Sequence, residues 1–221
     1  MVRAGVVVFA AAAVAGAAQA STSFANGGFE NQLAGWTASG PGVVATPMTV
    51  HINAQAPNGP VFTPVAGDYH AELNANAAAA PVTLSQSFDV SGAWRLTGWA
   101  AFLAQDAMED GFYDDYGFVR LTEGVTIWQL FGSDVAAVGG YGYTPWTAIA
   151  SDQLAGGHYT LTAGVVNADD NFNPSRLLVD SFQVVEAPAA IPEPGAWTLM
   201  IGGALGAGAA LRLGRRRRAT G

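Results

Sequence analysis

Residues 82–90 read Val82-Thr83-Leu84-Ser85-Gln86-Ser87-Phe88-Asp89-Val90, a stretch in which apolar and polar side chains alternate almost throughout. Alternation with a period of two indicates a β-strand with one buried face. Residues 159–165 repeat this pattern. Further runs of β-branched or aromatic residues, each with the length of a strand, occur at 94–103, 116–122, 126–131 and 177–184.

Turn-forming residues separate these segments, among them Ser91-Gly92, Gly139-Gly140, Gly156-Gly157 and Asn173-Pro174. Gly, Pro and Asn adopt or impose the backbone angles that turns require. No window of the same region shows the period of an amphipathic helix, which is about 3.6 residues. We therefore predict an all-β fold for residues 21–187, an antiparallel β-sandwich of jelly-roll type with about eight to ten short strands.

The region between residues 21 and 190 is strongly acidic. It contains three arginines, no lysine and sixteen acidic residues, which gives a formal charge of −13. Nucleic-acid binding needs Lys and Arg to displace counterions from phosphates, so this charge argues against a nucleic-acid partner. Cations and neutral polar ligands are better candidates, and the alternative is that the acidic residues only keep a weakly charged surface soluble. The chain has no cysteine, which excludes disulfides, thiolate metal sites and cysteine nucleophiles.

Residues 1–20 have the three parts of a secretory signal peptide. Arg3 provides a positive start, residues 4–18 are an unbroken apolar run, and Ala18-Gln19-Ala20 is a small-residue cleavage motif. The apolar run is short for a bilayer core that is about 30 Å thick. We therefore expect cleavage after Ala20 and export of the protein rather than a retained N-terminal anchor.

The C-terminus is predicted to cross a membrane once. Residues 188–194 form a Pro-rich linker, and residues 195–213 are an apolar segment rich in Gly and Ala. As a helix with a rise of about 1.5 Å per residue this segment is about 28 Å long, which matches a bilayer core. The arginines that follow favour a cytoplasmic tail. Residues 195–221 are thus predicted as a transmembrane helix with an Arg-rich tail, and residues 21–194 lie outside the plasma membrane.

Several residues of this C-terminus occur in a characteristic order: Pro192, Glu193, Pro194, Trp197, Met200, Arg215, Arg216, Arg217 and Arg218. In this order and spacing the segment resembles the PEP-CTERM sorting domain. The resemblance implies recognition by an exosortase, a membrane-embedded protease or transferase that cleaves near the Pro-Glu-Pro motif. The protein would be anchored transiently in the inner membrane and then reach the cell surface or extracellular matrix of a bacterium that secretes exopolysaccharide. Such a signal is an address and carries no information about the activity of the body.

A second resemblance concerns the body. Asn26-Gly27-Gly28-Phe29-Glu30 followed by Gly35-Trp36 is similar to the opening strand of galactose-binding-like jelly rolls, which include many carbohydrate-binding modules. Residues 177–182 are similar to the last strand of the same domains. In that fold the two strands lie close together, and an early Glu and a late Asp share a structural calcium.

The resemblance thus implies calcium as a cofactor, with Glu30 and Asp180 as ligands. Calcium takes about six to eight oxygen ligands, so these two carboxylates form only part of a site. The alternatives are a surface position for Glu30 and hydrogen bonds from the backbone to Asp180. The acidic segment 106–115 is expected to be a solvated loop, with calcium binding as the alternative.

Tyr141, Tyr143 and Trp146 lie in a Gly-rich segment and are candidate ligand-binding residues. Exposed aromatic rings combine an apolar face with polar edges, and this suits them to stacking on sugars. Packing of these rings against the sandwich is the alternative. The tryptophans within predicted strands are expected in the core: Trp94, Trp99 and Trp128.

No catalytic motif is visible, because the three histidines are dispersed and no nucleophile motif accompanies them. We predict a non-enzymatic, exosortase-sorted surface or matrix protein that binds exopolysaccharide and carries a structural calcium. Two alternatives remain open. One is a structural or adhesive protein without glycan binding, and the other is a polysaccharide-cleaving enzyme.

Overall fold

The computed structural model describes residues 22–51, 59–75, 80–105, 115–168 and 173–187. The predicted signal peptide, Pro-rich linker, sorting motif and C-terminal helix lie outside these residues, as does most of the acidic segment 106–115. Within the described ranges, no helix has the length and apolar character that are needed to cross a membrane.

The described residues form twelve strands and one short helix. The strands of the first half are β1 Thr37–Ser39, β2 Val43–Thr46, β3 Thr49–Val50, β4 Val61–Phe62, β5 His70–Asn74, β6 Val82–Val90 and β7 Trp94–Leu103. The elements of the second half are β8 Tyr116–Glu123, β9 Thr126–Asp134, α1 Val135–Val138, β10 Thr147–Ala150, β11 Gly157–Val166 and β12 Arg176–Glu186.

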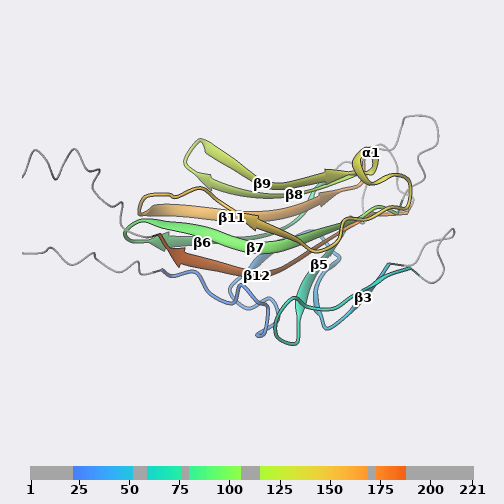
Figure 1. Cartoon of the computed structure of the whole chain (residues 1–221), viewed down its shortest axis with the longest axis horizontal. Helices are drawn as coiled ribbons and strands as arrows, with labels where there is room; N and C mark the ends of the chain where they lie inside the picture. The colour runs from blue at the N-terminus through green and yellow to red at the C-terminus, as the bar shows by residue number, and fades with distance from the viewer. Residues whose placement is uncertain (1–21, 52–58, 76–79, 106–114, 169–172, 188–221) are drawn as a thin grey trace, which may run out of the picture. The chain divides into compact units, whose positions relative to one another are not determined.

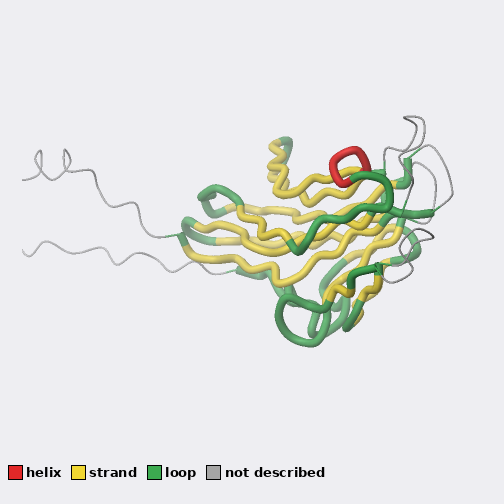
Figure 2. Tube along the Cα trace, turned by 45° about the vertical axis from the view of Figure 1, so that its right-hand side comes forward, coloured by secondary structure: helices red, strands yellow, loops and turns green. Residues whose placement is uncertain are grey.

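The strands build two five-stranded sheets (Figures 1 and 2). Sheet A has the order β1-β6-β11-β8-β9, and sheet B has the order β10-β7-β12-β5-β2. β3 and β4 form a separate pair. The pairings within both sheets are antiparallel. From β5 to β8 the chain changes sheet at every connection, an alternation that is typical of jelly rolls. The predicted antiparallel β-sheet architecture is confirmed.

The period-two pattern explains the strands at the centre of each sheet. β6 and β7 have the predicted bounds, and every second residue of β6 is buried. The buried set includes the polar Gln86, which interrupts the apolar pattern. Its Oε1 accepts a hydrogen bond from the Ala25 N–H at 2.9 Å, and its Nε2 donates to the Ala25 carbonyl at 3.0 Å. Both polar atoms of this buried amide are therefore satisfied.

The core lies between the two sheets, and large rings fill its centre. Trp94 of β7 and Tyr159 of β11 are fully buried, with their ring centroids 4.7 Å apart. Trp128 is half-buried against the same cluster. The prediction that Trp99 is a core residue is wrong, because this side chain is half-buried outside the core cluster. Trp99 lies five positions after Trp94, and an odd spacing in one strand places two side chains on opposite faces of the sheet.

The predicted opening strand at residues 26–36 is also absent, and turns occupy this segment. Asn26 and Phe29 have positive φ angles, which do not occur in strands. The expected closeness to the last strand is nevertheless found, because the Phe182 N–H donates to the Gly27 carbonyl at 2.9 Å. Phe29 is fully buried, and its ring packs against Trp36. The segment thus closes one edge of the core without joining a sheet.

Candidate functional site

The outer face of sheet A carries a row of polar side chains that crosses four strands. The register pairs Ser85 of β6 with Thr162 of β11, and Thr162 with Arg120 of β8. Arg120 is in turn paired with Gln129 of β9. All four side chains are half-buried or exposed. Neighbouring strands lie about 4.8 Å apart, so the row is about 14 Å long. We call these four residues the polar row.

Hydroxyl groups lie beside the polar row. Ser87 Oγ and Thr160 Oγ1 are 2.8 Å apart, and Thr122 Oγ1 donates to the Thr160 carbonyl at 3.4 Å. At the end of β6, His158 Nδ1 lies 2.9 Å from an Asp89 carboxylate oxygen, and both side chains are exposed. This part of the face therefore offers mainly uncharged groups that both donate and accept hydrogen bonds.

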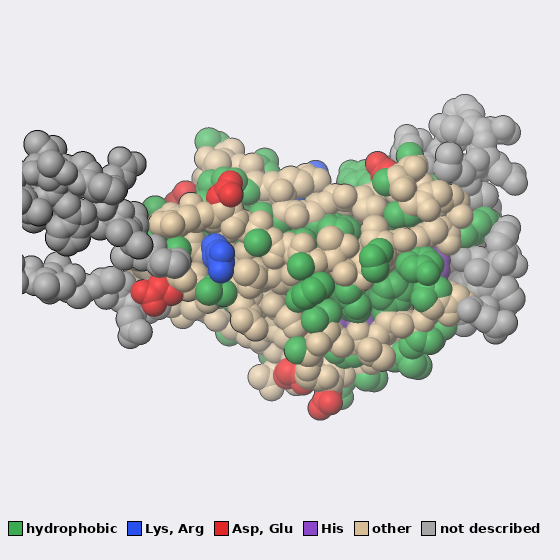
Figure 3. Space-filling model, in the orientation of Figure 1, with side chains coloured by type: hydrophobic (Ala, Val, Ile, Leu, Met, Phe, Trp, Pro, Cys, Tyr) green, Lys and Arg blue, Asp and Glu red, His purple; other side chains and the backbone are tan. Residues whose placement is uncertain are grey.

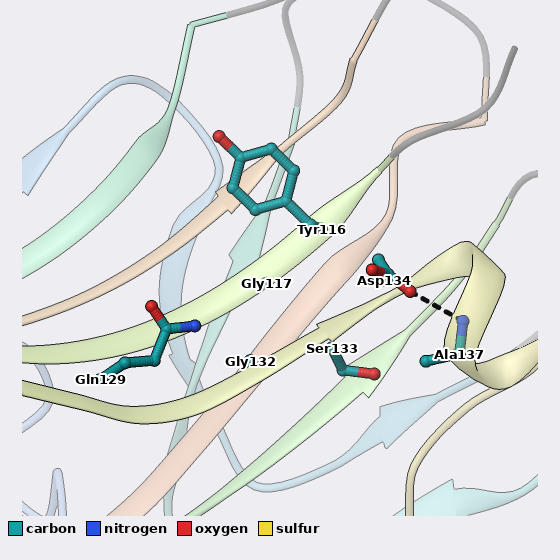
Figure 4. Close-up of a pocket in the computed structure, with 7 residues that line it drawn as sticks. All are labelled: Tyr116, Gly117, Gln129, Gly132, Ser133, Asp134 and Ala137. Atoms are coloured by element: carbon teal, nitrogen blue, oxygen red, sulfur yellow. Dashed lines mark hydrogen bonds between the residues drawn. The ribbon is translucent and has the colours of Figure 1, made fainter.

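A hollow of about 300 Å³ adjoins the polar row on β8 and β9, where Gln129 belongs to both (Figure 4). Its lining includes Tyr116 of β8 and Ser133 of β9. Gly132 faces Phe118 across the two strands. A Cβ atom at Gly132 would collide with the amide nitrogen of Gln129. The Gln129 amide can lie in this position because residue 132 is a glycine. We call this depression the β8–β9 hollow.

Tyr116 provides the exposed aromatic ring of the hollow. Its side chain is 38% exposed, whereas Phe118, at a ring distance of 6.2 Å, is 7% exposed. Arg120 covers Phe118, with Cζ 4.3 Å from the ring centroid. Arg120 Nε also donates to Gln129 Oε1 at 3.2 Å. The guanidinium is therefore held against a ring and an amide, and Tyr116 stays partly exposed beside it.

Asp134 is the single carboxylate among the described residues that line the hollow. Its Oδ1 accepts a hydrogen bond from the Ala137 N–H at 2.7 Å and so caps the first turn of α1. Glycoside hydrolases generally use a pair of carboxyl groups that flank the scissile bond. The described lining contains one carboxyl group and not such a pair.

The predicted calcium ligand Asp180 lies away from this hollow, on β12. Its Oδ2 accepts hydrogen bonds from the Val65 N–H at 2.7 Å and the Ala66 N–H at 3.3 Å. The Ser181 N–H donates to Oδ1. Burial raises the pKa of the Asp180 carboxyl above its ordinary value, and the N–H groups of Val65 and Ala66 partly oppose that increase. Asp180 thus anchors the segment 63–69, which we call the clamped loop.

Glu30 binds the same loop from the N-terminal segment. Its carboxylate accepts hydrogen bonds from the Asp68 N–H at 3.0 Å and the Tyr69 N–H at 3.1 Å. Gly67 lies between these contacts and Asp180, with a φ of +75°. A Cβ atom at Gly67 would collide with the Glu30 carboxylate, so glycine is required there for the backbone angle and for the close approach.

The two predicted calcium ligands therefore meet at one loop, but they face backbone N–H groups. Calcium requires a shell of oxygen ligands. The described residues contain no group of three or more His, Asp or Glu side chains that could hold a metal ion. In this arrangement the Glu30 and Asp180 carboxylates fit the anchoring of the loop and do not fit calcium. Calcium binding stays a prediction from the resemblance.

The predicted aromatic ligand-binding residues pack against sheet B. The ring of Phe62 lies 5.9 Å from Tyr143 and 6.2 Å from Trp146. Trp146 Nε1 donates to the Thr63 carbonyl at 2.9 Å, which ties this cluster to the clamped loop. Tyr141 and Trp146 are half-buried, and Tyr143 is 45% exposed. Figure 3 shows hydrophobic side chains gathered in the region of β3 and β5.

Comparisons with known proteins give a likeness in fold only. No protein-family model and no curated protein sequence matches the chain. The xylan-binding domain from CBM 22 is similar in structure, with 14% identity and a TM-score of 0.40, over 74% of this chain and 94% of that one. The tandem CBM22 domain of Paenibacillus barcinonensis Xyn10C has 16% identity and a TM-score of 0.40, over 84% and 49% of the two chains.

The enzymatically active domain of bacteriophage CBA120 tailspike protein 4 is a third similar structure, with 12% identity and a TM-score of 0.40. The match covers 74% of this chain and 21% of the tailspike chain, so the chain spans about a fifth of that protein. At these TM-scores the likeness carries no argument about a ligand.

The sequence reasoning missed Tyr116, Gln129 and the polar row. The signal was present in the outward positions of the predicted strands, where Ser85 and Thr162 alternate with core residues. What the sequence lacked was the order of the strands in the sheet, which places these residues in one line.

Proposed function

We propose that the protein binds a polysaccharide chain on the outer face of sheet A. The observation that carries the proposal is the polar row, which crosses four strands and leads into a hollow with an exposed tyrosine. A sugar polymer presents alternating hydroxyl edges and apolar ring faces, and a row of hydrogen-bonding groups that ends at an aromatic ring matches both.

Each residue has a distinct part in this binding mode. The ring of Tyr116 stacks on the C–H face of one sugar unit in an amphipathic contact. The amide of Gln129 and the hydroxyl of Thr162 bind sugar hydroxyls as donors and acceptors. The length of the row, about 14 Å at the usual strand spacing, exceeds one sugar ring, so the face takes a chain rather than a free monosaccharide.

The proposal includes a place of action. The charged start, apolar run and small-residue motif of residues 1–20 support export. The Pro192-Glu193-Pro194 motif, the apolar segment and the terminal arginines support transient anchoring in the inner membrane and sorting by an exosortase. In this setting the ligand is the exopolysaccharide of the producing bacterium, and the protein belongs to the cell surface or extracellular matrix.

The test of the binding site compares variants of the full-length protein by affinity electrophoresis in gels that contain this exopolysaccharide. Tyr116→Ala removes the stacking ring, and we expect it to weaken binding by about tenfold or more, since aromatic contacts contribute about 1 kcal/mol beyond area burial. Ile127→Ala is the matched control, because Ile127 is 62% exposed on β9 and does not line the hollow.

A wild-type protein that is not retarded by the polysaccharide contradicts the proposed function. Equal retardation of wild type and Tyr116→Ala contradicts the proposed site. A third variant, Tyr143→Ala, tests the aromatic cluster on sheet B. If this variant alone loses binding, the sugar site is the one predicted from the Gly-rich segment and not the β8–β9 hollow.

Export and sorting are tested separately in the producing bacterium. Replacement of Glu193 by Gln removes the charge of the Pro-Glu-Pro motif, and we expect the variant to accumulate in the inner-membrane fraction with its C-terminus intact. The wild-type protein is expected at the cell surface in a shortened form. Surface display of the variant at the wild-type level contradicts sorting through this motif.

A further inference from the structure

A second groove lies on the outer face of sheet B, opposite to the β8–β9 hollow across the sandwich core. Its volume is about 540 Å³, and its lining comes from β7, β10, β12 and the clamped loop. Val65 and Ala66 of the clamped loop line the groove, and both are anchored by the Asp180 carboxylate. This side of the groove is thus held in place by buried hydrogen bonds. We call it the sheet B groove.

Trp99 contributes an aromatic ring to the sheet B groove. It is half-buried, and its indole nitrogen makes no hydrogen bond with the part of the chain that the structure describes. A tryptophan on the outer face of a strand is costly to leave in water, because it exposes a large apolar area. Thr97 of β7 and Gln183 of β12 also line the groove, and neither side chain has a hydrogen-bond partner among the described residues.

Arg95 is the distinctive residue of the groove. The structure describes three arginines, and two of them have partners. Arg120 donates to Gln129, and Arg176 lies 3.6 Å from a Glu72 carboxylate oxygen. Arg95 is exposed, and it makes no hydrogen bond or ion pair within the described residues. In a body with a formal charge of −13, an arginine that forms no ion pair with the described residues is unusual.

The charge of the groove is complementary to an anion. Among the described residues that line it, Arg95 is the single charged side chain. Asp180 lies below the clamped loop with its oxygens occupied by N–H groups. The planar guanidinium matches a carboxylate with two parallel hydrogen bonds. Arg95 and Trp99 are four positions apart on one strand, about 13 Å, which separates the charge from the stacking ring by more than one sugar unit.

We infer that the sheet B groove is a second glycan site, and that it binds a polysaccharide segment with carboxylate-bearing sugars. Arg95 binds the carboxylate, and Trp99 stacks on a sugar ring further along the same chain. The inference rests on the proposed function in one respect, because it assumes that the protein meets extracellular polysaccharide. The two sites lie on opposite outer faces, so one molecule can hold two chains and join them.

The test uses polygalacturonate and its fully methyl-esterified form, two probes with the same backbone that differ in carboxylate charge. Binding of the full-length protein is measured by affinity electrophoresis at about 0.15 M salt, where the Debye length is about 8 Å and the repulsion between the acidic body and the polyanion is largely screened. The variants are Arg95→Gln, Arg95→Lys and, as a control on the other face, Ile127→Ala, because Ile127 is exposed on β9 and lines neither the β8–β9 hollow nor the sheet B groove.

We expect Arg95→Gln to weaken binding to polygalacturonate by about tenfold or more, since hydrogen bonds between charged groups are the strong ones. Arg95→Lys keeps the charge but loses the planar fork, and an intermediate affinity is expected. Ile127→Ala is expected to bind polygalacturonate as the wild type does. The difference between wild type and Arg95→Gln should vanish on the esterified probe.

Two results would overturn the inference: failure of the wild-type protein to bind polygalacturonate, or equal binding by wild type and Arg95→Gln. Neither result touches the proposed function, which depends on Tyr116 and the bacterium's own exopolysaccharide. If Tyr116→Ala loses exopolysaccharide binding and Arg95→Gln binds polygalacturonate as the wild type does, the protein has one site, on sheet A. Arg95 is exposed, so its replacement by Gln does not threaten the fold.

Discussion

Acidification is expected to destabilise the fold through His70. This side chain is fully buried on β5, and its Nε2 lies 2.8 Å from Thr49 Oγ1. The Thr49 hydroxyl donates its own proton to Glu72 Oε2 at 2.6 Å, so the hydrogen bond with His70 requires a proton on Nε2. Burial lowers the pKa of His70 from 6.5 to about 4. The folded protein therefore holds a neutral imidazole at neutral pH.

The sign and size of the effect follow from this difference in pKa. Between pH 6.5 and about 4 the unfolded chain binds the proton and the folded protein does not, so the free energy of unfolding falls as the pH is lowered. One pKa unit corresponds to about 1.4 kcal/mol. The full shift is therefore worth about 3 kcal/mol, of which about 2 kcal/mol should be lost by pH 5.

The measurement is urea denaturation at pH 7.5, 6.5, 5.5 and 4.5 for wild type and His70→Gln. Glutamine keeps a hydrogen-bond donor near Thr49 but does not titrate. The raised pKa of Asp180 acts in the opposite direction, because this carboxyl favours the folded state as the pH falls. The difference between the two proteins removes that contribution. Equal loss of stability in wild type and variant between pH 6.5 and 4.5 refutes the reasoning about His70.

Three further predictions concern the β8–β9 hollow, the clamped loop and calcium. Gly132→Ala should displace the Gln129 amide from the β8–β9 hollow, so polysaccharide affinity falls several-fold while the thermal midpoint stays unchanged; an unchanged affinity in electrophoresis contradicts this. Gly67→Ala should destabilise the fold by about 1–2 kcal/mol in thermal unfolding, because it imposes strain at positive φ and displaces Glu30. Chelation with EDTA should leave the thermal midpoint unchanged; a lower midpoint that added calcium restores would show that the protein binds calcium.

The six long strands were predictable because their signal is local, whereas the short strands β1 to β5 and β10 were not predicted. In β6 and β7 the alternation of side chains reports the two faces of a sheet, and the predicted bounds agree with the structure. The position of Trp99 was predictable by the same rule, since Trp94 and Trp99 cannot share a face of one strand. The prediction that all strand tryptophans are core residues was therefore wrong for Trp99, whose odd spacing from Trp94 places it on the other face.

The polar row was beyond prediction for a different reason. Its members come from strands that are far apart in the sequence, and antiparallel register is determined by pairing across the whole sheet. A register shift between Val119 and Arg120 also changes which residue of β9 faces Arg120. The clamped loop shows a similar limit. Glu30 and Asp180 were expected to be close to each other, but the N–H groups that they bind belong to a loop with no distinctive composition.

Binding of exopolysaccharide by this protein is best measured by co-sedimentation of the purified protein with the polysaccharide of its own bacterium. The measurement is made with calcium and again with a chelator. We expect saturable binding that is equal in both conditions, because backbone N–H groups satisfy the Glu30 and Asp180 carboxylates without an ion. Absence of binding in both conditions contradicts the proposed function and favours a structural or adhesive role.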